Sequence, residues 1–163
     1  MKFVADNMLG RLAKWLRILG YDTVYVRTDD DEELIDIAET EDRILLTRDT
    51  RLAKSWVVPT VLIKSEEISS QLKQVIKRYN LDLEENLLSR CPICNIEVSP
   101  IDKERIFNYI PKLVYETYNE FWTCKNCGRY YWEGTHWKNI KQKVKEIRME
   151  LSDEDSRIKN RKR

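Results

Sequence analysis

Two pairs of cysteines stand out among the residues of this chain that could do chemistry. The pairs are Cys91-Pro-Ile-Cys94 and Cys124-Lys-Asn-Cys127, and they account for all four cysteines of the sequence. Each pair has the spacing of a knuckle, a turn whose backbone amides point toward thiolate sulfurs, and four thiolates satisfy a tetrahedral zinc ion. We therefore predict that Cys91, Cys94, Cys124 and Cys127 hold one metal ion, with zinc favoured.

The identity of that metal has one alternative. The 29 residues from 95 to 123 exceed the usual gap of a zinc finger and also suit a rubredoxin-like iron site. Zinc is favoured because Asn95 stands where a glycine is expected after the first knuckle of such an iron site. Since cysteine sulfurs fill all four positions, we expect the ion to have a structural role.

A second group of residues that could do chemistry consists of aspartates. Asp6, the cluster 29–31 and Asp49 each follow a short β-prone segment. In open parallel sheets, ligands bind at the edge formed by the carboxyl ends of the strands. Carboxylates gathered there repel one another unless they bind a divalent cation, and hard oxygen ligands suit Mg²⁺ or Mn²⁺. Each aspartate also has a structural interpretation as a helix cap or turn residue, and the pattern alone does not decide between the two.

The elements that must position these residues alternate in type. Strands are predicted at residues 3–5, 23–26, 43–47 and 59–63. Helices are predicted at residues 7–19, from the acidic cluster through Ala38, and through residues 68–79 with Ser65 as the cap, while a short helical turn is predicted at 51–55. In the first helix, Asp6 suits the N-cap and Gly20 the stop. This alternation predicts an α/β domain around a mainly parallel sheet, residues 1–89.

The second half of the chain has a different character. We predict a small, aromatic and β-rich ribbon with a C-terminal helix over residues 90–151, followed by a mobile charged tail over residues 152–163. The final helix has an apolar seam that includes Trp137, Ile140 and Val144, beside a face rich in lysine. His136, the only histidine, is interpreted as a packing or phosphate-contacting residue at the start of this helix.

Composition and charge exclude several classes of protein. With 42% apolar residues, four glycines and four prolines, the chain is neither disordered nor fibrous. We see no signal peptide and no apolar stretch long enough to span a membrane, so a cytoplasmic protein is expected. Residues 1–90 carry a net charge of −3 and residues 91–163 a net charge of +4.

Four stretches of this chain resemble the Mut-seven C-terminal RNase family. They are FVADNMLGRLAKWLRILGYDT at residues 3–23, RILLTRD at 43–49, RCPICN at 90–95 and YWEGTHW at 131–137. The resemblance implies a PIN-like nuclease domain with a zinc ribbon and an activity as a metal-dependent ribonuclease. It matches Asp6, Asp30 and Asp49 to the acidic positions of a PIN-like site, although Asp29 or Asp31 could take the place of Asp30. The fourth acidic residue that is common in PIN nucleases has no clear counterpart.

The resulting hypothesis is an RNA endonuclease. Asp6, Asp30 and Asp49 are expected to bind Mg²⁺ or Mn²⁺, with a water that attacks phosphorus in line and is oriented by Thr47. Residues expected to contact RNA phosphates, each of which could equally be an ordinary solvated charge, are Lys14, Arg17, Arg48, Arg51, Lys141 and Lys145. The alternatives are a non-catalytic RNA-binding or ribosome-associated module, and an adaptor that binds another protein.

Two expectations about stability accompany this hypothesis. Because relief of clustered charge is neutral or stabilising, Asp6→Asn and Asp49→Asn should abolish cleavage without lowering stability. Because metal binding drives the folding of small metal domains, Cys91→Ser should unfold the ribbon and leave the first domain largely folded.

Overall fold

The computed structural model describes residues 1–54 and 57–161, and the chain divides into two compact units at residues 96 and 97. The predicted helical turn at 51–55 and the predicted tail at 152–163 each reach residues that lie outside the described ranges. Each unit is described by itself below.

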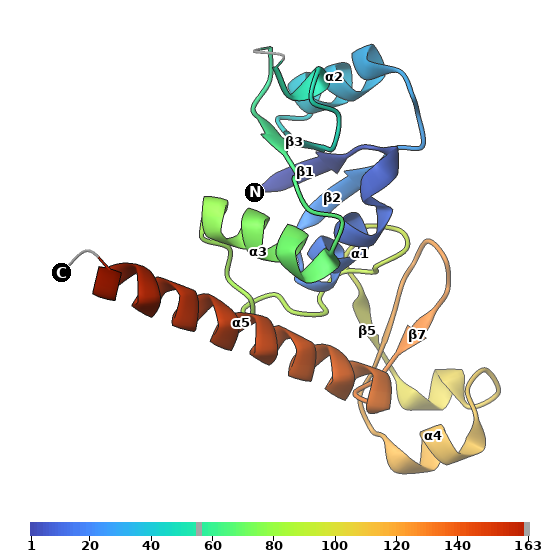
Figure 1. Cartoon of the computed structure of the whole chain (residues 1–163). Helices are drawn as coiled ribbons and strands as arrows, with labels where there is room; N and C mark the ends of the chain where they lie inside the picture. Colours follow the sequence, from blue (N-terminus) through green and yellow to red (C-terminus); the bar gives the residue numbers. More distant parts are fainter. Residues whose placement is uncertain (55–56, 162–163) are drawn as a thin grey trace. The chain divides into compact units, whose positions relative to one another are not determined.

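The first unit is built on four parallel strands. They are β1 (Lys2–Ala5), β2 (Asp22–Tyr25), β3 (Ile44–Thr47) and β4 (Thr60–Leu62), in the order β2-β1-β3-β4 (Figure 1). All three strand pairings are parallel. The chain runs from β1 to β2 on one side and from β3 to β4 on the other, and this reversal between the neighbouring strands β1 and β3 creates the switch point at which open α/β sheets bind ligands.

Helices connect these strands and cover the sheet. A short 3₁₀ helix, η1 (Asn7–Leu9), leads into α1 (Gly10–Ile18), and α2 (Asp31–Thr40) and α3 (Ile68–Tyr79) follow in the chain, with the 3₁₀ turn η2 (Leu52–Lys54) between β3 and β4. The helices α1 and α3 contact each other, whereas α2 packs on β1 and β3. Figure 1 shows α2 on one face of the sheet and α1 with α3 on the other.

The alternation of side chains along β1 explains this two-sided packing. Val4 joins Leu34 and Ala38 of α2 and Leu45 of β3 in one buried cluster. Phe3 points to the opposite face, since neighbouring residues of a strand alternate, and its ring meets that of Tyr79 at the end of α3. Both faces of β1 are therefore buried, as expected for the central strand of a parallel sheet.

The predicted fold class is confirmed by this sheet, and the end of the first helix is a specific success. Gly20 has a φ of 90°, its N–H donates to the carbonyl of Arg17 at 2.9 Å, and the N–H of Tyr21 donates to the carbonyl of Leu16 at 2.9 Å. This pair of hydrogen bonds is a Schellman motif, in which glycine adopts the left-handed conformation at little cost.

The predicted cap of α3 is wrong. Glu67, and not Ser65, is the N-cap, and its carboxylate accepts hydrogen bonds from the N–H groups of Ser69 at 2.8 Å and Ser70 at 2.6 Å. Ser65 acts one step earlier, because its hydroxyl accepts from the N–H of Glu67 at 3.1 Å. The two carboxylate oxygens of Glu67 thus satisfy two orphan amides of the first turn.

The second unit contains a small antiparallel sheet. Its strands are β5 (Ser99–Ile101), β6 (Phe121–Thr123) and β7 (Tyr130–Tyr131), in the order β5-β6-β7. The sequence predicts a β-rich segment here, but two short helices, η3 (Lys103–Ile106) and α4 (Lys112–Thr117), also separate β5 from β6. These helices account for the long gap between the two cysteine pairs.

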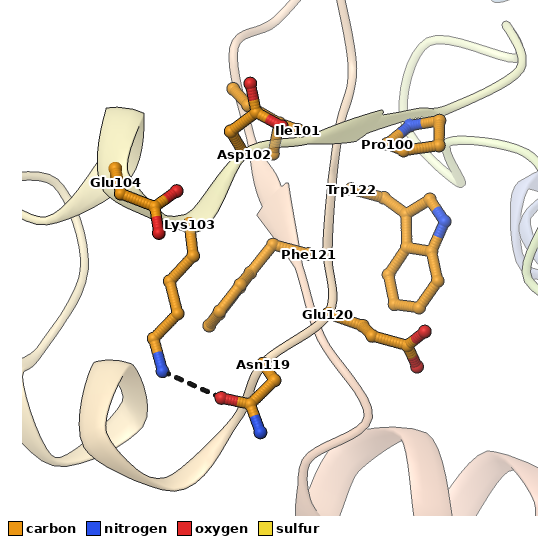
Figure 2. Close-up of a pocket in the computed structure, with 9 residues that line it drawn as sticks. All are labelled: Pro100, Ile101, Asp102, Lys103, Glu104, Asn119, Glu120, Phe121 and Trp122. Atoms are coloured by element: carbon orange, nitrogen blue, oxygen red, sulfur yellow. Dashed lines mark hydrogen bonds between the residues drawn. The ribbon is translucent and has the colours of Figure 1, made fainter.

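A pocket of about 540 Å³ lies beside β5, η3 and β6 in this unit (Figure 2). Its walls include the carboxylates of Asp102, Glu104 and Glu120, while the amine of Lys103 donates a hydrogen bond to Asn119 at 3.0 Å. The three carboxylates repel a phosphate group, and the one lysine, which already donates to Asn119, offsets only part of their charge. This pocket therefore gives no support to an RNA contact.

The last helix, α5 (Thr135–Arg161), is longer than the sequence predicts. Its seam is formed by Ile140, Val144 and Ile147, all buried, which confirms the predicted apolar positions. The helix continues past Leu151, so the segment 152–161 of the predicted tail has helical backbone. None of the helices in residues 1–54 and 57–161 combines the length and the apolar character required to cross a bilayer.

Candidate metal centre and catalytic edge

The two cysteine pairs fold into the same backbone turn. In the first, the N–H of Asn95 donates to the carbonyl of Cys91 at 3.0 Å, and in the second the N–H of Gly128 donates to the carbonyl of Cys124 at 2.8 Å. The N–H of Cys94 also approaches the sulfur of Cys91 at 3.4 Å, as expected for an amide that supports a thiolate. Both pairs therefore have the local geometry of a metal knuckle.

The residue after each pair has a left-handed backbone. Asn95 has a φ of 62° and Gly128 a φ of 69°. Glycine adopts this conformation freely, and asparagine is among the few other residues that tolerate it. The absence of glycine after the first pair therefore does not prevent the knuckle from forming.

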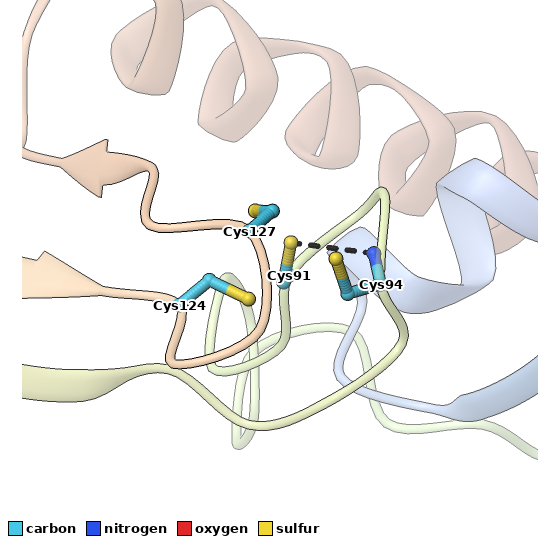
Figure 3. Close-up of side chains that lie close together, drawn as sticks. All are labelled: Cys91, Cys94, Cys124 and Cys127. Carbon is cyan, nitrogen blue, oxygen red and sulfur yellow. Dashed lines mark hydrogen bonds between the residues drawn. The ribbon is translucent and has the colours of Figure 1, made fainter.

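The four sulfurs converge on a common point (Figure 3). All of them lie within 4.8 Å of one another, with Cys91 and Cys124 buried, Cys94 half-buried and Cys127 exposed. Zn–S bonds of about 2.3 Å in a tetrahedron place sulfurs about 3.8 Å apart, so only small adjustments are needed to bind an ion. The predicted meeting of the four cysteines is confirmed, and this donor set could hold a metal ion such as zinc.

Asp6 lies immediately after β1 at the carboxyl edge of the parallel sheet, and only 5% of its surface is exposed. Its Oδ2 accepts hydrogen bonds from the hydroxyl of Thr47 at 2.7 Å and the N–H of Arg48 at 2.8 Å. Its Oδ1 accepts from the N–H of Met8 at 2.9 Å, which caps η1. Asp6 thus joins the end of β1 to the end of β3 while it starts the first helical segment.

Thr47 links Asp6 to Asp49. Its hydroxyl, which is fully buried, donates to Asp6 and accepts a hydrogen bond from the N–H of Asp49 at 2.9 Å. The hydroxyl proton is committed to Asp6, so it is not available to the water that the sequence analysis assigned to Thr47. The structure gives this residue a bridging role between the two acidic positions.

Asp49 turns the chain after β3. Its Oδ1 accepts hydrogen bonds from the N–H groups of Arg51 at 2.6 Å and Leu52 at 3.2 Å. These two bonds lower the pKa of the Asp49 carboxyl below its usual value, because they stabilise the charged form. The side chain is partly exposed, and Oδ2 lies 3.6 Å from the guanidinium of Arg51.

The acidic cluster after β2 contributes differently at each position. Asp30 is the N-cap of α2, and its exposed carboxylate accepts from the N–H of Glu32 at 2.9 Å. Asp29 accepts a hydrogen bond from the side-chain amide of Asn7, the residue next to Asp6. The carbonyl of Asn7 in turn accepts from the hydroxyl of Tyr25 at 3.0 Å. Asp29, and not Asp30, therefore has a direct connection to the segment that carries Asp6.

The predicted aspartates do not form a compact ligand group like that of the cysteines. Within residues 1–54 and 57–161, the four cysteines are the only group of three or more acidic, histidine or cysteine side chains with ligand atoms that close together. Asp6, Asp30 and Asp49 also each cap a turn or helix, as the structural interpretation of the sequence expects. The hydroxyl of Thr47 connects the carboxylate of Asp6 to the backbone N–H of Asp49, whereas the carboxylate of Asp30 bonds within the first turn of α2.

Two of the predicted RNA-binding cations lie beside this edge. The guanidinium of Arg48 pairs with the exposed carboxylate of Glu66 at 3.1 Å, and 87% of the Arg51 side chain is exposed. Lys14 is exposed on α1. The Glu66 side of this pair is exposed to solvent, and ion pairs at the surface contribute little stability, so Arg48 can exchange Glu66 for a phosphate at low cost.

The predicted cations of α5 are also at the surface. Lys141 is exposed, lies 3.4 Å from Glu133 and sits over the ring of Trp137 at 5.7 Å from the centroid. Lys145 is exposed one turn further along the helix. His136 is exposed in the first turn of the same helix.

Arg17 lies in a different environment from the other predicted RNA contacts. It is half-buried on α1, and its guanidinium donates hydrogen bonds to the carbonyls of Thr23 at 2.8 Å, Pro92 at 3.2 Å and Ile93 at 2.9 Å. Pro92 and Ile93 are the two residues inside the first knuckle. This structural role of Arg17 has no signal in the helical pattern of α1.

An ion-pair network that has no signal in the sequence pattern lies at the opposite edge of the sheet, around Asp22 at the start of β2. Buried Arg43 binds Asp22 at 2.7 Å and 3.3 Å with its two terminal nitrogens and Glu41 at 2.6 Å with Nε. Asn95 also donates to Asp22 at 2.7 Å. Burial alone raises the pKa of the Asp22 carboxyl, but the hydrogen bonds from Arg43 and Asn95 outweigh it and leave the pKa lowered.

Comparison with known families gives one further finding on this geometry. The model of the family described as the Mut7-C RNAse domain matches residues 1–144, which include the parallel sheet, both knuckles and the first part of α5. No curated protein and no solved structure matches the chain.

Proposed function

Because the chain belongs to the Mut7-C RNAse domain family, we propose that it is a ribonuclease that cleaves RNA phosphodiester bonds with a divalent cation. The observation that carries this proposal is the hydroxyl of Thr47, which joins Asp6 to Asp49 at the carboxyl edge of the sheet. Open α/β sheets bind their ligands at this edge, next to the switch point. A nuclease-like role and the position of these two acids agree with each other.

The two acids are suited to a hard cation. Asp6 accepts three hydrogen bonds, and since a carboxylate offers about four lone-pair sites, about one remains for a ligand. Mg²⁺ is commonly held by one or two carboxylates together with water and substrate phosphates, so a site based on Asp6 and Asp49 needs few further protein ligands. When bound, such a cation lowers the pKa of a water and stabilises the charge on the leaving oxygen.

The chain's own residues hold and orient the substrate in this proposal. Thr47 and the N–H of Arg48 fix the carboxylate of Asp6, while the guanidinium groups of Arg48 and Arg51 bind phosphate oxygens of the RNA backbone. Water attacks the phosphorus and the bond to the 3′ oxygen breaks. The products therefore carry a 5′-phosphate and a 3′-hydroxyl.

The third acidic ligand is proposed to come from the cluster after β2. The resemblance to the family points to Asp30, whereas the hydrogen bond from Asn7 favours Asp29. Replacing Asp29, Asp30 and Asp31 singly with asparagine and measuring the cleavage rate of each variant separates these assignments.

The test of the function is cleavage of total cellular RNA by the purified chain, with and without Mn²⁺, followed by mapping of the new ends. We expect cleavage only with the cation and ends with a 5′-phosphate. Asp49→Asn should reduce the rate by at least about a hundredfold, as expected when a ligand of the catalytic ion is lost. Asp36→Asn removes the same charge from an exposed position in the middle of α2 and should cleave like the wild type.

The chemical groups at the new RNA ends also distinguish this activity from that of a contaminating nuclease. Cleavage that continues in the presence of a chelator and leaves a cyclic phosphate would come from another enzyme class. If Asp49→Asn cleaves as fast as Asp36→Asn, the proposed site is wrong.

We propose zinc as the structural ion of the four cysteines and the cytoplasm as the place of action. Four thiolates favour zinc among the common divalent metals, and in a reducing compartment cysteines are kept available for metal binding instead of forming disulfides. Elemental analysis should find about one zinc per chain. An iron absorption spectrum, or a metal content near zero, contradicts this part of the proposal.

A non-catalytic RNA-binding or ribosome-associated protein is the second candidate. The observation that favours it is the use of Asp6, Asp30 and Asp49 as caps, since a structural role accounts for each of them. Salt-sensitive RNA binding without cleavage under any divalent cation selects this candidate.

A further inference from the structure

One arginine side chain, that of Arg17, connects the first knuckle to the parallel sheet. The Nη1 of Arg17 donates to the carbonyls of Pro92 and Ile93 at 3.2 Å and 2.9 Å, while its Nε donates to the carbonyl of Thr23 in β2 at 2.8 Å. The planar guanidinium, with donors in a fixed fork, is suited to hold several carbonyls at once. One side chain therefore connects α1, β2 and the turn between Cys91 and Cys94.

The positive charge of Arg17 gives its contact with the first knuckle a second role. A divalent ion bound by four thiolates has a net charge of −2, and a charged group inside a protein is costly unless a counter-charge is close. Burial lowers the pKa of Arg17, and the charges of Cys91 and Cys94 act in the opposite direction, which means that both sulfurs lie within electrostatic reach of the guanidinium. Arg17 is in place to compensate part of the thiolate charge.

Asn95 makes an independent contact between the same two segments. Its side-chain oxygen accepts from the N–H of Thr23 at 2.9 Å, and its amide nitrogen donates to Asp22 at 2.7 Å. Asp22 is held in turn by Arg43 at 2.7 Å. The residue that ends the first knuckle is thus fixed on the first residues of β2.

From these contacts we propose that Arg17 is a positioning residue of the metal site, which holds the first knuckle and balances its charge, and that metal binding is thereby coupled to the folding of the parallel-sheet unit. This inference goes beyond the proposed nuclease activity, and it rests on the proposed zinc. Outer residues that orient metal ligands commonly change metal affinity by roughly 10- to 100-fold when they are replaced. Arg17, Asn95 and Asp22 form such an outer layer for Cys91 and Cys94.

The experiment measures the dissociation constant of zinc for the full chain by competition with a chromophoric chelator. Arg17→Gln removes the charge and the fork, and we expect its zinc affinity to fall about tenfold or more. Lys14→Gln is the matched control, because it removes one positive charge from an exposed position of the same helix. Its zinc affinity should stay within about twofold of the wild type, since exposed charges act weakly.

Two further variants keep the test decisive if Arg17→Gln does not fold. Arg17→Lys keeps the charge but not the fork, so it should lose affinity to a smaller extent. Asn95→Gly keeps the left-handed backbone and removes only the side-chain contacts to Asp22 and Thr23. It should also weaken zinc binding, and its cobalt spectrum should remain that of a tetrahedral thiolate site.

The outcomes separate this inference from the proposals on which it rests. A wild-type chain that binds no zinc contradicts the proposed metal. A wild-type chain that binds zinc, with unchanged affinity in Arg17→Lys and Asn95→Gly, overturns the inference. Equal losses in Arg17→Gln and Lys14→Gln overturn it as well, because they reflect only the overall charge of α1.

Discussion

The carboxylate of Asp6 accepts three hydrogen bonds, and this number determines what an asparagine does at that position. Asparagine has one oxygen and one NH₂ group, so its nitrogen must face either the N–H of Met8 or the donors of Thr47 and Arg48. We therefore expect Asp6→Asn to lower the free energy of unfolding by about 1–3 kcal/mol, the usual cost of an unsatisfied buried group. This differs from the sequence analysis, which expects no loss.

Asp49→Asn should behave differently from Asp6→Asn. Asp49 binds the N–H groups of Arg51 and Leu52 through one oxygen, and asparagine caps such turns about as well as aspartate. Urea unfolding of both variants should show a clear loss for Asp6→Asn and almost none for Asp49→Asn. Equal stabilities would mean that the buried bonds of Asp6 contribute little. Asp49→Asn is for this reason the better variant for activity measurements.

Asp22 gives the first unit a dependence on acid. Its folded pKa is lowered, because the hydrogen bonds from Arg43 and Asn95 outweigh the effect of burial. The unfolded chain has the usual pKa near 3.9, so it binds a proton before the folded chain does as the pH falls. The stabilisation is therefore fully present above about pH 5 and is lost as the pH falls through 3.9 toward the lower folded value.

The measurement is the free energy of urea unfolding between about pH 6 and pH 3. The wild type should lose more stability over this range than Asp22→Asn, since the variant has no carboxylate to protonate. Parallel curves for the two proteins would show that Asp22 does not carry this dependence.

At the scale of elements, the turn after α1 predicts that alanine is tolerated less well at Gly20 than at Gly128. Gly20 and Gly128 both have left-handed φ values, of 90° and 69°. An added Cβ at Gly20 would meet the carbonyl oxygen of Asn86 at 2.3 Å, whereas at Gly128 no atom lies within 4 Å. The two positions therefore share the backbone strain and differ in the steric clash.

Gly128→Ala should cost about 1–2 kcal/mol, the price of a left-handed alanine, and Gly20→Ala should cost clearly more. Thermal unfolding of both variants, each with zinc present, checks this order. If Gly20→Ala is the milder change, the loop around Asn86 moves more easily than its close approach suggests.

The helix α5 permits a test of RNA binding at the level of a whole face. Lys141 and Lys145 are exposed on it, and replacing both with alanine should weaken RNA binding similarly across sequences. The slope of affinity against salt should fall by roughly 0.7 per lost contact on single strands. Lys143→Ala is the control, since Lys143 is half-buried and lies 3.6 Å from Glu146. Unchanged affinity in the double variant would indicate that RNA does not contact this face of α5 and binds at the edge around Arg48 and Arg51.

The elements themselves could be predicted where local chemistry determines them. The four strands and the Schellman turn at Gly20 follow from β-branched runs and from a glycine after an apolar helical pattern. The length of α5 could not be predicted, because residues 152–161 lack an apolar pattern and are helical only as a continuation of the packed seam at Ile140, Val144 and Ile147. The α4 helix was missed for a similar reason, since it buries none of its residues.

At the scale of the whole molecule, the candidate sites differ in how much of each could be predicted from the sequence. The four cysteines could be found from spacing alone, because metal ligands must have these types in this order. The contacts of Arg17 with Pro92 and Ile93 could not, since they join positions about 75 residues apart and depend on the packing of α1. Thr47 was predicted to orient the attacking water, but its link from Asp6 to the N–H of Asp49 depends on the register of β1 beside β3.

Metal removal should affect more of the chain than the sequence analysis expects. Cys91 and Cys94 belong to the unit of residues 1–96, where Arg17 and Asn95 hold their turn. We therefore expect Cys91→Ser, or treatment with a strong chelator, to speed hydrogen exchange in α1 and β2, because local opening follows the loss of these contacts. Mass spectrometry of peptides from residues 10–25 measures this effect, and α2 provides the internal comparison. Unchanged exchange in α1 and β2 would restore the expectation of an independent first domain.

The contact between Arg17 and Pro92 also affects the order in which the chain can fold during its synthesis. A ribosome that has just made α1 must add 75 more residues before this partner exists, although all four strands of the sheet are complete by residue 62. From residue 62 until the first knuckle is made, the emerging chain has all four strands but lacks the carbonyls of Pro92 and Ile93 that Arg17 binds. Domains fold during synthesis as their sequences become available, so the contact between α1 and the first knuckle is among the last that the first unit can form. An ion held by all four cysteines can bind only later still, because Cys127 is made about 110 residues after Arg17.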